Sequence, residues 1–249
     1  MSAIDAYFDD VSARLDVMRR GQRGAIEAAA ERGANAIQAR RPLYLFDTGH
    51  LITHELSART GGLAAYTALV LPTGPGADNE YVLRTRQPSP EQAQAQVEDT
   101  VRQFFSSGLV ESGDLIFISS VSGTKPLVVE LARQARASGV GVVALTGVDF
   151  SRSLVAAHPN GNRLCDEADV VLDCAIVHGD ASIEIPGASA AVAPWSGIAG
   201  GILMWAVTVA IVERLVGDGA DPTIYTSVNL PGGWDAYLAS RTRYREEGW

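Results

Sequence analysis

The sequence predicts a single α/β domain, a three-layer α/β/α sandwich with a five-stranded parallel sheet that is preceded by two N-terminal helices. Short apolar runs alternate with segments of helical periodicity, which is the pattern of β-α-β units. Hydrophobic residues make up 47% of the 249 residues, as expected for strands that are covered on both faces. No break in composition divides the chain, so its length is assigned to one large core.

The first 40 residues are expected to form a helical extension, with residues 41–249 as the main domain. A second, Ala-rich helix should run from about Gln22 to Ala39. Two helices before the first strand are unusual in a minimal doubly wound unit, and we expect them to supply a dimer surface. The apolar positions of the first helix recur at helical spacing; they are Ile4, Tyr7, Phe8, Val11, Leu15 and Met18.

From residue 43 onward, short apolar runs are expected to form buried strands. Helical stretches between them imply a parallel sheet with right-handed crossovers. The five runs are LYLFD (43–47), YTALVL (66–71), LIFIS (115–119), VGVVALT (140–146) and DVVLD (169–173).

The helices between these strands carry recognisable end signals. Ser89 and Gln92 form a capping box around Pro90, and Gly108 should end that helix. The next helix is expected from about Pro126 to Ser138. Residues 72–90, rich in Pro, Gly and polar residues, are predicted to form a long loop of the kind that often carries function.

Charge and cysteine content limit the partners and the compartment. A net charge of −9 argues against nucleic-acid or anionic membrane partners, because phosphate groups are bound by clustered Lys and Arg. The two cysteines form no disulfide framework, and with no secretory start they indicate the cytoplasm. The longest apolar run, residues 200–212, is shorter than the roughly 20 residues that span a bilayer, which favours a core helix.

The segment SSVSGTKP, residues 119–126, is the strongest candidate for a binding site. In parallel sheets, ligands bind outside the carboxyl ends of the strands. This segment follows a predicted strand and opens a helix, so backbone amides, hydroxyl groups and the helix dipole all favour an anion there. Gly123 permits a close approach that a side chain would obstruct. From composition alone, the serines are equally well explained as a helix cap.

The order of motifs resembles that of the SIS (sugar isomerase) family, which implies a flavodoxin-like sheet and a phosphosugar ligand. Ser120, Ser122, Gly123 and Thr124 resemble that family's phosphate-binding loop, and the resemblance implies that the three hydroxyl groups hold phosphate oxygens. It covers approximately residues 40–217. The other matching stretches are FDTGHLITHELSARTGGLA (46–64), GVGVVALTG, NGNRLCDEADVVLDC and GDASIEIPG (179–187), which resemble a poorly characterised subgroup of phosphoheptose-isomerase-like proteins.

The first loop departs from the family pattern. Family members usually have Gly-x-Gly followed by Ser, whereas this chain has Asp47-Thr48-Gly49-His50-Leu51. Thr48 or Thr53 would have to replace the missing hydroxyl group. The expected substrate-binding residues are Thr48, Gly49, Ser119, Ser120, Ser122, Gly123, Thr124 and Glu184.

Aldose–ketose interconversion needs a base beside the carbonyl group and an acid for the oxygens. Glu55 is the base candidate, because His54-Glu55-Leu56 resembles the Glu-Leu pair of SIS isomerases; otherwise it is a solvated helix residue. His50 and His158 are candidate acids. His50 and His54 lie one helical turn apart and could share a zinc ion, but no full ligand set is visible, so no metal is assigned. Glu184 has either a raised proton affinity from partial burial or an outward position on an edge strand.

With the resemblance, these residues predict an isomerase that acts through an enediol-type intermediate, without a cofactor. The resemblance also implies a homodimer with sites near the subunit interface. A lyase, an etherase or a deaminase would have nearly the same sequence features. The competing hypothesis is a non-catalytic phosphosugar sensor that acts through another protein. A dinucleotide-binding domain is disfavoured, because the first loop lacks G-x-G-x-x-G.

Overall fold

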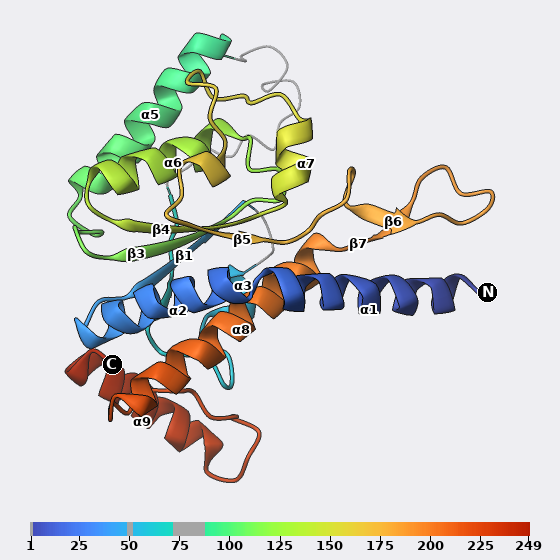
Figure 1. The fold of residues 1–249 in the computed structure, drawn as a ribbon. Coiled ribbons are helices and arrows are strands. Elements are labelled where there is room, and N and C mark those ends of the chain that lie inside the picture. The colour runs from blue at the N-terminus through green and yellow to red at the C-terminus, as the bar shows by residue number, and fades with distance from the viewer. Residues whose placement is uncertain (1, 49–51, 72–87) are drawn as a thin grey trace.

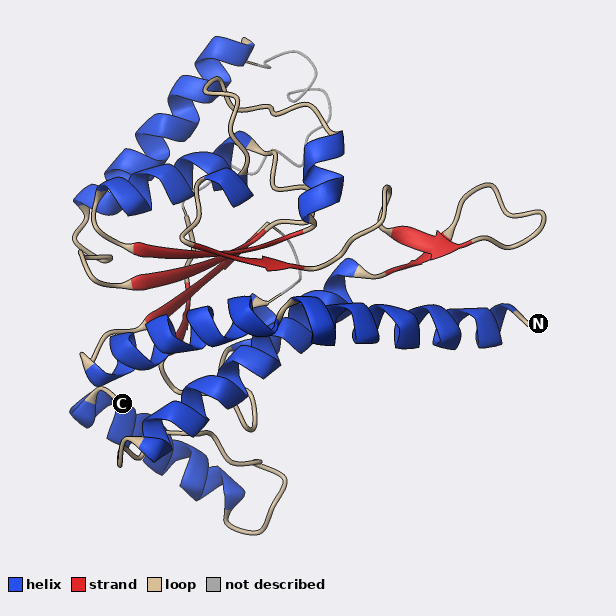
Figure 2. Cartoon of the chain, viewed as in Figure 1, coloured by secondary structure: helices blue, strands red, loops and turns tan. Residues whose placement is uncertain are grey.

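The structure, a computed structural model, describes residues 2–48, 52–71 and 88–249. Its middle layer is a five-stranded parallel sheet in the order β2-β1-β3-β4-β5, with helices on both faces (Figures 1 and 2). This confirms the predicted α/β/α sandwich. The strands are β1 (Leu43–Asp47), β2 (Tyr66–Ala68), β3 (Leu115–Ser119), β4 (Gly141–Thr146) and β5 (Val170–Asp173). Only β2 is much shorter than its apolar run.

Two pairs of helices cover the two faces of the sheet. The pair α5 (Pro90–Ser106) and α6 (Pro126–Ala137) lies on one face, and the pair α2 (Arg23–Gln38) and α8 (Ser196–Gly217) lies on the other (Figure 1). Alternate strand residues serve the two cores. Leu45 and Phe117 pack on the α2/α8 side, whereas Ile116 and Ile118 pack on the α5/α6 side. Strands buried on both faces explain the unbroken apolar runs.

The second N-terminal helix is part of the main core. Helix α2 buries Ala29, Ala30, Ala34 and Ile37 in the same cluster as the sheet and α8. Of the two N-terminal helices, only α1 (Ala3–Gly21) extends beyond the body (Figure 1). The remaining short elements are α3 (Thr53–Leu56), α7 (Val148–Ser153), the 3₁₀ turn η1 (Leu164–Asp166) and the C-terminal helix α9 (Gly233–Glu247).

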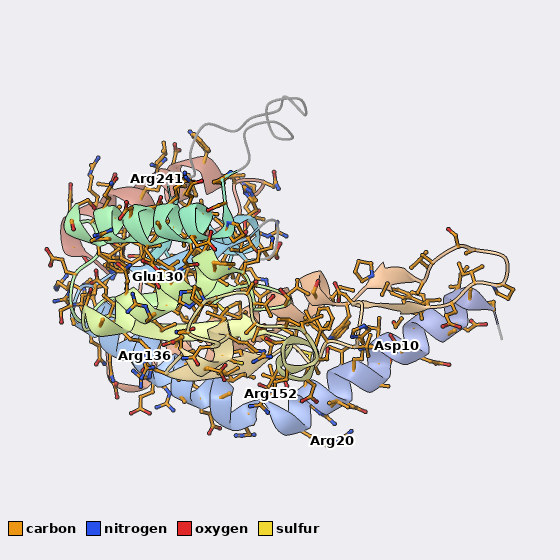
Figure 3. The ribbon with its side chains drawn as sticks, turned by 90° about the horizontal axis from the view of Figure 1, so that it is seen from above. Asp10, Arg20, Glu130, Arg136, Arg152 and Arg241 are labelled. Carbon is orange, nitrogen blue, oxygen red and sulfur yellow. The ribbon has the colours of Figure 1, made fainter. Side chains whose placement is uncertain are left out.

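A projecting arm is the feature that the sequence did not predict. It combines the N-terminal half of α1 with an antiparallel hairpin, β6 (Ala181–Ile183) and β7 (Val192–Pro194) (Figures 1 and 3). Asp10 of α1 accepts hydrogen bonds from Arg14 at 2.7 Å and from Ser182 of the hairpin at 2.8 Å. The Arg14 guanidinium also lies 5.8 Å from the ring centre of Trp195. These contacts fix the hairpin against α1.

Helix α8 behaves as the core helix predicted from the apolar run. It has 22 residues, and the mean hydropathy of an 18-residue window within it is 1.7, so by length and composition alone it could cross a membrane. One face is nevertheless buried in the protein core. Leu203, Val207, Ile211 and Leu215 lie there at helical spacing, against α2 and the sheet.

Candidate functional site

The carboxyl ends of β1 and β3 lie side by side at the centre of the sheet. The chain crosses from β1 to β2 on one side and continues through β3 to β5 on the other, so this is the point where the strand order reverses. Asp47, the last residue of β1, is in register with Ser119, the last residue of β3. Parallel sheets bind ligands at such switch points. The ends of β1 and β3, where the two candidate loops begin, therefore lie together where a ligand is expected.

The β3–α6 loop, residues 120–125, presents several hydroxyl groups at this point. Ser122 Oγ lies 3.1 Å from Thr124 Oγ1, and the Gly123 amide donates to Ser120 Oγ at 3.3 Å. Ser119 Oγ is buried and has no hydrogen-bond partner among the described residues. Helix α6 begins immediately after the loop, and its dipole favours negative charge there. The five residues 119, 120 and 122–124 therefore lie together at the end of β3.

Gly123 adopts a left-handed conformation with φ of +60°. A β-carbon at this position would lie 2.8 Å from Thr146 Oγ1 and 3.3 Å from Leu164 Cβ. Both the backbone angle and the packing therefore require glycine. We expected Gly123 to permit the close approach of another group, and the groups that approach it are the side chains of Thr146 and Leu164.

A hollow of about 430 Å³ opens beside the loop, and we call it the β1 hollow. Thr48 and Thr53, the two residues considered as replacements for the missing hydroxyl group, both line it. Asp47 Oδ2 accepts hydrogen bonds from the amides of Ile52 at 3.1 Å and Thr53 at 2.8 Å, which fixes the start of α3. Lys125 also lines the hollow. Its ammonium group brings positive charge to a hollow whose other polar lining residues are Asp47, Thr48, Thr53 and His54.

A second hollow of about 530 Å³, the α3–α8 hollow, contains Glu55. Glu55 Oε1 accepts a hydrogen bond from Trp205 Nε1 at 3.0 Å and lies 3.5 Å from Arg59 Nη2. Its carboxylate is thus held in place, and it is not a freely solvated helix residue. His54 lines both hollows, so Glu55 adjoins the mouth of β1.

His158 lies in a different environment from Glu55. Its Nε2 is 3.1 Å from Glu130 Oε2, and its Nδ1 is 2.7 Å from Asn160 Oδ1. Burial acts to raise the pKa of Glu130, but hydrogen bonds from Arg133, Gln134 and His158 hold that pKa below its ordinary value. Glu130 lies within the body in Figure 3. The structure thus brings His158 against α6 and not to the two hollows, so its predicted role as an acid gains no support from its position.

The other predicted residues fall outside the two hollows or outside the described chain. Glu184 is exposed on the hairpin of the arm, where it lines a separate hollow of about 430 Å³. Its carboxylate is therefore not brought to the β3–α6 loop of its own chain. Gly49 and His50 lie outside the described residues. Within the described ranges, no three His, Cys, Asp or Glu side chains gather as a metal site.

Four residues of the site were missed by sequence reasoning. Lys125 stands inside the quoted loop motif, and Arg59 follows Glu55 by one helical turn, so both carried a local signal. Trp205 and Thr146 gave no such signal. Trp205 lies on the helix formed by the apolar run. Its contact with Glu55 joins positions 150 residues apart.

Sequence comparison supports the motif assignment. Residues 6–147 match the SIS domain family. A UPF0309 protein of Brucella canis is 34% identical over 249 residues, covering 97% of this chain and 96% of that protein. A UPF0309 protein of Brucella suis shows the same identity and coverage.

Solved structures share the fold at low sequence identity. Phosphoheptose isomerase from Neisseria gonorrhoeae superimposes with a TM-score of 0.52 at 17% identity, covering 84% of this chain and 97% of that one. Phosphoheptose isomerase from Francisella tularensis gives 0.51 at 15% identity, with 86% and 100% covered. These likenesses concern the fold.

Replacing Gly123 by alanine should destabilise the protein more than the same change at Gly161. Both glycines have positive φ, +60° and +77°, but a β-carbon at Gly161 meets nothing within 4 Å. Gly161→Ala should therefore show only the backbone cost, about 1–2 kcal/mol. Gly123→Ala adds the contact with Thr146. Chemical denaturation measures both changes, and equal losses would contradict the packing argument.

Proposed function

Because the chain belongs to the SIS domain family, we propose that it binds a small sugar phosphate between β1 and β3 and interconverts its aldose and ketose forms. The β3–α6 loop holds the phosphate group. Glu55 acts as the base that moves a proton between the two carbons of an enediol-type intermediate. No cofactor is required for this chemistry.

The observation that carries the proposal is the arrangement of the β3–α6 loop at the switch point. Ser119 and Ser120 are buried at the end of β3, and Ser122 and Thr124 place further hydroxyl groups beside them. Lys125 adds a positive charge at the rim of the β1 hollow. Hydroxyl groups, amides and one ammonium group form a set of donors suited to phosphate. Binding energy from the non-reacting phosphate would then orient the reacting carbons.

The position of Glu55 supports the choice of an isomerase. Its carboxylate is fixed by the indole N–H of Trp205 and lines a hollow next to the phosphate-binding edge. A held carboxylate beside an anchored substrate is the arrangement that proton transfer requires. A lyase or a deaminase could use the same groups, and the products of turnover distinguish these reactions.

A non-catalytic sensor is the second candidate function. It would use the same phosphate loop, while Glu55 would only hydrogen-bond to the sugar. The net charge of −9 gives such a sensor no DNA-binding character, so it would act through another protein. The two functions differ in turnover and not in ligand binding.

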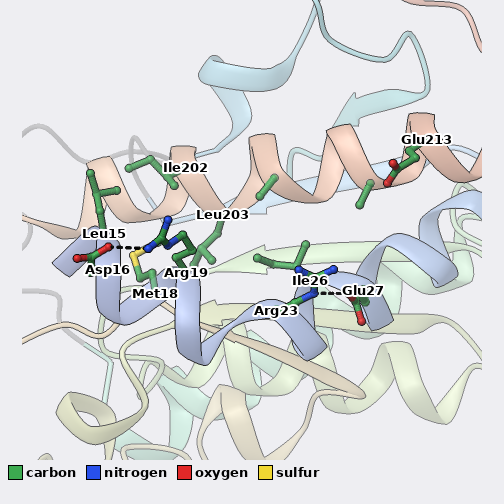
Figure 4. A pocket seen from close by; sticks show the side chains of 12 residues that line it. Leu15, Asp16, Met18, Arg19, Arg23, Ile26, Glu27, Ile202, Leu203 and Glu213 are labelled. Atoms are coloured by element: carbon green, nitrogen blue, oxygen red, sulfur yellow. Dashed lines mark hydrogen bonds and ion pairs between the residues drawn. The ribbon is translucent and has the colours of Figure 1, made fainter. Parts of the chain in front are cut away.

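We also propose that two copies associate through the arm. Ile4 and Phe8 of α1 are 69% and 62% exposed, and Ile185 and Val192 of the hairpin are 41% and 44% exposed. A groove of about 610 Å³ lies between α1, α2 and α8 (Figure 4). Its lining is mainly apolar and includes Leu15, Met18, Ile26, Leu203 and Ala210, and its charged residues are Asp16, Arg19, Arg23, Glu27 and Glu213.

We propose that the arm of a second copy occupies this groove. The arm is preformed, because Asp10, Arg14 and Ser182 bind the hairpin to α1. Ile202 lines both the groove and the α3–α8 hollow. A partner arm seated there would reach the edge of the candidate site. This would bring the partner's exposed hairpin, which carries Glu184, near a site that its own chain does not reach.

The cytoplasm is the proposed location. Both cysteines are unpaired in the structure, Cys174 buried and Cys165 partly buried. Burial raises the pKa of Cys174 to about 12, so this thiol stays protonated and unreactive. Unpaired thiols are typical of reducing compartments.

Sugar phosphates should raise the melting temperature of the protein, whereas the matching free sugars should not. A ligand that binds only the folded state stabilises it by about 2.7 kcal/mol at 100 times its Kd. A thermal-shift panel of hexose and heptose phosphates against the free sugars measures this difference. Equal responses to phosphorylated and free sugars would remove the phosphate anchor from the proposal.

Glu55→Gln should abolish turnover of the best ligand from that panel while its affinity is retained. Loss of a general base typically lowers kcat by about 10²–10⁴-fold. The amide oxygen can still accept from Trp205, so the fold should be unaffected. Glu31→Gln, at an exposed position on α2, is the matched control. Tight binding by the wild-type protein without any turnover would favour the sensor.

Phe8→Asp should convert a dimer into a monomer with an unchanged fold. The new charge would have to be buried in the apolar groove of the partner. Leu230→Asp is the control, because Leu230 is equally exposed at 62% and lies outside the arm and the groove. Light scattering after size-exclusion chromatography gives the mass of each variant. A monomeric wild-type protein at micromolar concentration would refute the proposed pairing.

A further inference from the structure

Two carbonyl groups of the β3–α6 loop, those of Val121 and Gly123, accept hydrogen bonds from neighbouring elements on one side of the loop. Val121 O accepts a hydrogen bond from the Gly147 amide at 3.2 Å and from Thr146 Oγ1 at 3.3 Å. Gly123 O accepts one from the Leu164 amide at 2.8 Å. We call these three donors, at the end of β4 and the start of η1, the β4-side clamp.

A fixed carbonyl also fixes the amide of the next residue. The peptide unit is planar and trans, so the C=O of one residue and the N–H of the next point in opposite directions. Because Val121 O points toward β4, the Ser122 N–H points away from β4. Because Gly123 O points toward η1, the Thr124 N–H points away from η1. Strand β3 lies between β4 and β1, so the direction away from β4 is the direction of the switch point.

From this geometry, and on the premise of the proposed phosphate site, we infer that Thr146 is a positioning residue that directs the amides of Ser122 and Thr124 toward the bound phosphate. Thr146 supplies the only side-chain donor of the clamp, and it is fully buried. It touches the loop from beneath and does not contact the ligand. Its hydroxyl oxygen also limits position 123 to glycine, since a β-carbon there would lie 2.8 Å away.

The weak contacts on the outward side of the loop fit this role. The Thr124 amide lies 3.5 Å from Ser122 Oγ, at the limit of a hydrogen bond. The loop carbonyl groups that face β4 and η1 thus accept hydrogen bonds, whereas the amides that point away from these elements retain the capacity to donate to an anion.

The variant pair Thr146→Val and Thr146→Ser tests the inference. Valine keeps the approximate shape but removes the hydroxyl donor, and serine keeps the donor. A neutral hydrogen bond of this kind is worth about 1 kcal/mol, so Thr146→Val should weaken binding of inorganic phosphate and of the best sugar phosphate about three- to tenfold. Thr146→Ser should restore affinity to within about twofold of the wild-type value.

Ser151→Ala is the matched control. Ser151 is fully buried, its Oγ has no partner among the described residues, and it lies 3.4 Å from the β-carbon position at Gly123. Its loss should leave affinity unchanged. All affinities are measured by calorimetry well below the melting temperature of each variant, so a merely less stable protein would still bind normally.

Amide spectra give a readout that a purely structural role would not affect. In ¹H–¹⁵N spectra of the wild-type protein, the Ser122 and Thr124 resonances should shift as phosphate is added, and Thr146→Val should reduce those shifts. If sugar phosphates bind but neither amide responds, or Thr146→Val binds like the wild type, the inference is wrong and the proposed function stands. If no sugar phosphate binds at all, the proposed function itself fails, and the positioning role fails with it.

Discussion

The parallel pairing of β1 with β3 is the constraint on which the rest of the structure depends. All five residues of each strand pair in register, so Asp47 and Ser119 end side by side. The chain leaves these two ends toward opposite edges of the sheet, and parallel sheets bind ligands in the crevice at such a point. Both loops of the candidate site, and the helix that carries Glu55, follow from this pairing.

Around that crevice, contacts with neighbouring strands and helices hold the loop backbone and the side chains of the site in place. The β4-side clamp and the left-handed Gly123 fix one loop, and the Asp47 carboxylate fixes the start of α3. Trp205, from a helix on one face of the sheet, then fixes the Glu55 carboxylate. A site held in this way loses little freedom when a ligand binds. The proposed phosphate-binding edge and the proposed base are therefore preorganised by different layers of the sandwich.

In the proposed dimer, the arm links the candidate site to association of two copies. Its hairpin is fastened to α1 by one charged network, and it joins α8 at Trp195, whose indole N–H donates to Cys174 O at 2.9 Å. The groove beside α1 and the hollow around Glu55 share Ile202. In the proposed dimer, one helix, α8, contributes to the core, to the groove and to the candidate site.

The sequence by itself determined the layers and pointed to the β3–α6 loop as the candidate site. Runs such as LIFIS need burial on both faces, and the Ser89 capping box and the glycine of the β3–α6 loop act through neighbours a few residues away. Such local interactions can be predicted from the sequence, because the residues that take part are close together in it. Only the tertiary structure decided that His158 pairs with Glu130, that Glu184 lies on an arm, and that Trp205 and Thr146 hold the site. These contacts join distant segments, and nothing in a residue's own neighbourhood specifies which distant partner packing will bring to it.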